Sequence, residues 1–89
     1  MSPAVLHILL ALAPGAAHGY AIMQQTGLGP GTLYDNLQKL LTQGLIRETA
    51  GDDPRRKNYQ LTTVGRRTLS AEIERLEQLF QKAKEHLNA

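Results

Sequence analysis

Cysteine and tryptophan are both absent from this sequence, and phenylalanine occurs once. Without cysteine there is no disulfide and no thiolate metal site. At 89 residues the chain has room for one small domain, whose limited core often needs help from disulfides, a metal or a partner chain. A partner chain is the aid that remains. The lack of cysteine and of a signal peptide predicts a cytoplasmic protein.

Long apolar runs and catalytic motifs are missing as well. The most apolar stretch, residues 4–13, is far shorter than the roughly 20 residues that a membrane-spanning helix needs. The chain has no nucleophile motif and no carboxylate pair in an apolar setting, since Asp52 and Asp53 are adjacent acids in a turn-forming segment. We therefore expect no enzyme, no cofactor, no metal site and no membrane partner.

Positive charge is scarce overall but concentrated in one segment. The net charge is only +2, and before Arg47 the charged residues Asp35 and Lys39 cancel. Residues 47–67 contain six basic and three acidic residues, a local net charge of +3. A basic segment of this kind indicates a nucleic-acid partner.

Residues 29–44 predict the helix around which the chain is organised. Gly29 suits the N-cap, Pro30 the first helical position and Gly44 the position after the last turn. An apolar stripe at helical spacing would face the core: Leu33, Leu37, Leu40 and Leu41. Polar groups that pair with bases and phosphates occupy the other side: Thr32, Asp35, Asn36, Lys39 and Gln43. The pattern fits a DNA-recognition helix, and an ordinary amphipathic surface helix is the alternative.

Two further helices and a hairpin are expected around it. Residues 4–13 predict a buried helix, and residues 19–25 a short helix that a tight link joins to the recognition helix, which makes a helix-turn-helix. Strands at 45–50 and 57–61 flank a dense turn signal and place three cations at or near the tip: Arg55, Arg56 and Lys57. These cations predict a phosphate-binding wing, with a solvated charged turn as the alternative.

A long last helix is predicted from Thr62 or Thr63 to about Leu87. Its apolar residues follow heptad spacing: Leu69, Ile73, Leu76, Phe80, Ala83 and Leu87. A seam of this length predicts a homodimer, and a helix folded back on its own domain is the alternative. The expected fold is mainly α, a winged helix-turn-helix of three helices, a two-stranded β wing and a long C-terminal helix. Residues 1–66 would form the DNA-binding domain and residues 67–89 the dimerisation helix.

Several short motifs resemble the PadR family of bacterial transcriptional regulators. They are HGYAI at 18–22, LGPGTLY at 28–34, GLI at 44–46 and RKNYQLT at 56–62 followed by Gly65. The resemblance implies that the third helix and the wing bind DNA and that a single C-terminal helix dimerises. Those roles fall on Thr32, Tyr34 and Lys39, on Arg55, Arg56 and Lys57, and on residues 69–87. The link of Thr26, Gly27 and Leu28 is shorter than in many family members.

The expected function is a sequence-specific DNA-binding transcriptional regulator, a dimeric repressor whose partner is double-stranded DNA. We expect Thr32 and Asn36 to contact bases and the Tyr34 hydroxyl to reach a backbone phosphate. Some relatives bind small molecules at the dimer interface, but without tryptophan the chain predicts no particular effector. The alternative function is a winged-helix module that contacts proteins or acts as a scaffold.

Overall fold

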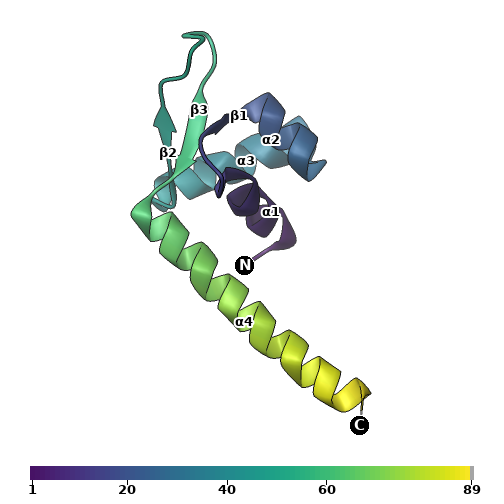
Figure 1. Cartoon of the computed structure of the whole chain (residues 1–89). Helices are drawn as coiled ribbons and strands as arrows, with labels where there is room; N and C mark the ends of the chain where they lie inside the picture. The colour runs from purple at the N-terminus through teal and green to yellow at the C-terminus, as the bar shows by residue number, and fades with distance from the viewer. Residues whose placement is uncertain (89) are drawn as a thin grey trace.

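The computed structural model of the chain describes residues 1–88 and contains four helices and three short strands among them. In order these are α1 (Pro3–Leu12), β1 (Ala17–His18), α2 (Gly19–Thr26), α3 (Pro30–Thr42), β2 (Ile46–Thr49), β3 (Asn58–Leu61) and α4 (Thr63–Leu87). The first three helices gather beside the sheet, whereas α4 runs away from them as a single arm (Figure 1). This arrangement confirms the predicted winged helix-turn-helix. Across residues 1–88, no helix is both long and apolar enough to cross a membrane.

The ends of α3 are set by the predicted local signals. Gly29 is the N-cap in an extended conformation, and Pro30 takes the first helical position, where the missing N–H costs nothing. Gly44 follows the C-cap with a φ of 73°, a left-handed conformation that glycine adopts without steric cost. Gly27 ends α2 in the same way, with a φ of 74°. The short link therefore turns sharply enough to place α2 and α3 in helix-turn-helix order.

The sheet has a third strand that the sequence did not predict. β1 pairs antiparallel with β3, which lies between β1 and β2. Ala17 lies opposite Tyr59 and His18 opposite Asn58. The expectation of a two-stranded sheet was therefore incomplete, because a two-residue strand has no periodicity of its own to detect. The pairing of β1 with β3 holds the start of α2 against the base of the wing.

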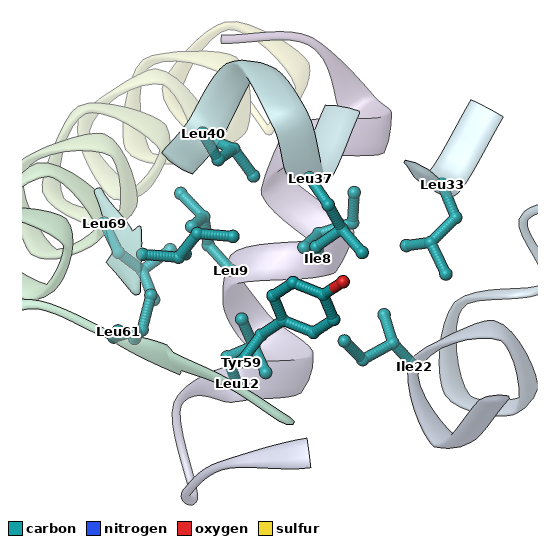
Figure 2. Close-up of a cluster of buried hydrophobic side chains, with 11 residues drawn as sticks. Ile8, Leu9, Leu12, Ile22, Leu33, Leu37, Leu40, Tyr59, Leu61 and Leu69 are labelled. Atoms are coloured by element: carbon teal, nitrogen blue, oxygen red, sulfur yellow. The ribbon is translucent and has the colours of Figure 1, made fainter. Parts of the chain in front are cut away.

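The core lies where α1, α2 and α3 meet β3. Ile8, Leu9 and Leu12 of α1 are fully buried and contact the predicted leucine stripe of α3. The ring of Tyr59 packs among these side chains in the middle of the cluster (Figure 2). The buried hydrophobic side chains of the described residues are Ile8, Leu9, Leu12, Ile22, Leu33, Leu37, Leu40, Ile46, Tyr59, Leu61 and Leu69.

The first turns of α4 belong to this body. Thr62 caps the helix by accepting a hydrogen bond from the Gly65 N–H, and its own hydroxyl donates to the Gly44 carbonyl. Leu69 is buried in the core, so its assignment to an exposed dimerisation seam is corrected: the side chain faces its own domain. Beyond these first turns, the exposed apolar side chains of α4 run from Ile73 to Leu87.

Candidate nucleic-acid interface

The outward face of α3 carries the polar side chains that could meet a DNA groove. Thr32, Asp35 and Lys39 are exposed, as the sequence predicted. Gln38 is exposed as well, and at 100° per residue it lies between Tyr34 and Asp35 on the helix surface. Gln38 was missed, although it lies outside the leucine stripe and carries the same amide group as Asn36. An amide that can pair with adenine therefore joins this face.

Asn36 is less available than the sequence suggested. Its side chain is half-buried, and its Nδ2 donates a 2.8 Å hydrogen bond to the Thr32 carbonyl one turn earlier in the same helix. One amide hydrogen is thereby used within α3. The carbonyl oxygen and the second hydrogen remain for an outside partner.

Tyr34 stands at the border between α3 and the wing. It is 47% exposed, and its hydroxyl packs over Gly19, where an added Cβ would collide with it. The start of α2 thus needs glycine to let the tyrosine lie across it. The hydroxyl thus packs on the start of α2, while nearly half of the residue stays open to solvent.

The wing cations are open to solvent but loosely paired with acids of the same hairpin. The side chains of Arg55, Arg56 and Lys57 are 90%, 60% and 71% exposed. Both arginines lie within 3.4 to 3.8 Å of the Asp53 carboxylate, and the Lys57 ammonium lies 3.7 Å from Glu48. Exposed pairs of this kind are weak, so the cations can exchange these partners for phosphates.

The recognition helix and the wing enclose a cleft of about 390 Å³. Its lining comes from β1, α2, α3 and the wing hairpin: His18, Gly19, Tyr20, Tyr34, Arg55, Arg56, Lys57 and Tyr59. Three of these residues are cationic and none is acidic. The structure therefore brings Tyr34 together with the three predicted wing cations, whereas Thr32, Asn36 and Lys39 lie outside the cleft.

His18 and Tyr20 are the lining residues that the sequence did not single out. His18 is the N-cap of α2, and its Nδ1 accepts a 3.2 Å hydrogen bond from the Ala21 N–H. Its ring stacks on Tyr20 with the ring centroids 6.5 Å apart. On the other side its Nε2 lies 3.3 Å from Nη1 of Arg56. The HGY motif placed these residues at a helix start, but only the pairing of β1 with β3 brings them to the wing.

Tyr59 forms the floor where the cleft meets the core. Burial raises the pKa of its hydroxyl, and the nearby carboxylate of Glu48 acts in the same direction. Tyr59 is therefore a neutral phenol at physiological pH and adds no charge to the cleft.

The arm presents a separate apolar surface. Ile73, Leu79, Phe80 and Leu87 are exposed along the part of α4 that extends beyond the body, and Phe80 is 64% exposed. Exposed large apolar groups at helical spacing are typical of an interaction surface. Of the predicted seam, Leu76 is half-buried and Ala83 is exposed.

A helix-turn-helix with a cationic wing beside its recognition helix defines the class of winged-helix proteins. Residues 5–71 match the PadR-like family of transcriptional regulators. The chain belongs to this family, which consists of regulators and not of enzymes.

A protein encoded in transposon Tn4556 of Streptomyces fradiae is 38% identical in an alignment of 78 positions that covers 81% of this chain and 22% of that protein. The chain thus spans about a fifth of the length of that relative. A PadR family transcription regulator from Clostridium difficile is 24% identical, with a TM-score of 0.76 and coverage of 99% of this chain and 100% of that one. BpsR of Bordetella bronchiseptica, whose DNA binding is regulated by 6-hydroxynicotinic acid, is 22% identical with a TM-score of 0.80. That match covers 94% of this chain and 65% of BpsR, and at this identity both structures support the fold alone.

Proposed function

We propose that this chain is a sequence-specific DNA-binding regulator that acts as a dimeric repressor. The observation that carries the proposal is the convergence of two features on one side of the molecule. Tyr34 of α3 and the wing cations line the same cleft, so a duplex that received α3 in its major groove would meet the wing at the flanking backbone.

The outward face of α3 is assigned to base reading. Thr32 and Lys39 lie close together on one side of Asp35, and Gln38 lies on the other side of it. Asn36 offers its remaining amide groups at the edge of the face. Side-chain amides pair with adenine and lysine with guanine, so this set can discriminate among base pairs. Asp35 on the same face would repel phosphate or accept a hydrogen bond from cytosine.

The wing is assigned to backbone contacts. Arg55, Arg56 and Lys57 at the hairpin tip can each neutralise a phosphate that flanks the groove, or reach into the minor groove. Their acidic partners Asp53 and Glu48 hold them only weakly in the free protein.

Dimerisation is assigned to the arm, with residues 1–66 as the DNA-binding part and residues 67–89 as the dimerisation part. A second copy would cover the apolar surface from Ile73 to Leu87, including Leu76, Phe80 and Ala83. Two symmetric DNA-binding bodies then fit a palindromic site. Occupation of such a site in a promoter would repress transcription, and a small-molecule effector could act on the dimer as the regulation of BpsR illustrates.

Selection of duplexes from a random pool, followed by salt titration, tests this function. A variant with Arg55→Ala and Arg56→Ala should bind every duplex more weakly and flatten the slope of log K against log salt by up to roughly 3–4 for a dimer. The matched control carries Lys82→Ala and Lys84→Ala, which remove the same charge from the arm and should leave the slope near that of the wild type.

Two outcomes would contradict the proposal. If the wild-type protein enriches no sequence, the regulator is not sequence-specific. If the wing variant keeps the wild-type slope, the wing does not contact DNA, and a protein-contacting role for the fold gains support.

A further inference from the structure

The contact between His18 and the wing has an unusual hydrogen-bond geometry. Nδ1 of His18 accepts from the backbone N–H of Ala21, which is a donor in every protonation state. A neutral imidazole has one acceptor nitrogen, so the hydrogen must sit on Nε2. Nε2 faces Nη1 of Arg56 at 3.3 Å, and an arginine guanidinium offers only donors. Two N–H groups therefore face each other, while the Asp53 carboxylate lies 3.8 Å from Arg56 at a different nitrogen, Nε.

An oxygen with two free lone pairs satisfies both donors at once, and beside the positive guanidinium an anionic oxygen is favoured over water. The cleft beside them is lined by the three wing cations and by the exposed Tyr34, and no carboxylate lines it. At about 390 Å³ the cleft has room for a phosphate group. It opens where α3 and the wing meet, which is where the backbone flanking an occupied groove would run.

We propose that this cleft binds one DNA backbone phosphate, which accepts hydrogen bonds from Nε2 of His18, the Arg56 guanidinium and the Tyr34 hydroxyl. The inference rests on the proposed function, because it names the DNA group that the cleft receives. His18 thereby becomes a phosphate-contacting residue in addition to capping α2. The pairing of β1 with β3 places His18 beside the wing, because it joins the start of α2 to the hairpin.

His18→Asn separates the capping role from the phosphate contact. Asparagine is among the best N-cap residues, so it preserves the bond to the Ala21 N–H but removes the Nε2–H group. We expect His18→Asn to weaken binding roughly tenfold or more on selected and scrambled duplexes alike, because a hydrogen bond to a charged group is lost. His7→Asn is the matched control, since His7 is exposed on α1 and lies outside the cleft.

Neutral methylphosphonate linkages identify the phosphate. In a duplex selected by the wild-type protein, single linkages are replaced in turn and the affinity of each duplex is measured. At one position per half-site, replacement should weaken binding of the wild type and of His7→Asn but have little further effect on His18→Asn. Tyr34→Phe should lose sensitivity at the same position.

Several results would overturn the inference. If the wild type binds its selected duplex but every position affects His18→Asn and the wild type equally, the cleft holds no phosphate while the proposed function stands. If no duplex is selected, the proposed function fails and the inference fails with it. Nitrogen-detected NMR of the free protein provides a test without DNA, because an Nδ1–H tautomer of His18 would remove the facing donors. Competition by inorganic phosphate beyond that of chloride at equal ionic strength, without position-specific coupling, would assign the cleft to a free anion.

Discussion

Phe80→Ala should dissociate the proposed dimer without unfolding the chain. Phe80 is 64% exposed on the arm and makes no contribution to the buried core. A phenylalanine buries about 150–250 Å² when covered, so a partner would remove roughly 100–150 Å² of this side chain from water. At about 25 cal/mol per Å² that is about 2.5–4 kcal/mol for each protomer and about 5–7.5 kcal/mol for the pair. The dissociation constant should therefore rise roughly 10⁴–10⁵-fold.

Sedimentation over a range of concentrations measures this change, and far-UV circular dichroism checks that α4 remains helical. Gln78→Ala is the matched control because Gln78 lies half a turn away, on the opposite side of the same helix from Phe80. A wild-type protein that sediments as a single chain at micromolar concentrations would refute the dimer. A Phe80→Ala variant that dimerises as tightly as the wild type would refute the arm as the interface.

Three further changes test the packing and the charges. Gly65→Ala should lower the free energy of unfolding by about 1–3 kcal/mol in urea titrations, because the new Cβ would collide with the Leu45 carbonyl oxygen; unchanged stability would contradict this packing. The hydrogen bond from Arg75 is the main reason that the pKa of Glu72 falls from 4.5 to about 2. The ion pair therefore stabilises the folded protein above about pH 4.5, and this stabilisation is lost as the pH falls toward 2. Glu72→Gln should reduce the pH dependence of the free energy of unfolding in this acid range, and an unchanged pH dependence would count against the ion pair. Asp53→Asn should tighten binding to all duplexes roughly twofold to tenfold in anisotropy titrations, since it frees the wing arginines; unaltered affinity would mean that Asp53 does not compete with DNA.

The features that the sequence predicted correctly depend on local signals. Gly29, Pro30 and Gly44 define the ends of α3 through backbone preferences that hold in any context. The leucine stripe follows helical spacing, and its buried members face the core as expected. The motif at residues 56–62 likewise locates the third strand, because a turn signal precedes its alternating residues.

The features that the sequence missed depend on contacts between distant segments. β1 exists only because Ala17 and His18 meet Asn58 and Tyr59, some forty positions later in the chain. Leu69 fits heptad spacing as well as Phe80 does, yet it packs into the core because the first turns of α4 lie against the body. Periodicity identifies an apolar face of a helix, but it does not say which part of that face its own domain covers.

The junction between the body and the arm links the two parts of the proposed function. The Thr62 N–H donates to the Leu45 carbonyl, and its hydroxyl donates to the Gly44 carbonyl at the end of α3. Gly65 packs against that same Leu45 carbonyl, so its lack of a side chain serves close packing and provides no free hinge. The direction of α4 is therefore fixed relative to α3. In a dimer joined through the arms, the spacing of the two α3 helices would follow from how the arms cross, and a change in that crossing would shift both recognition helices relative to successive major grooves.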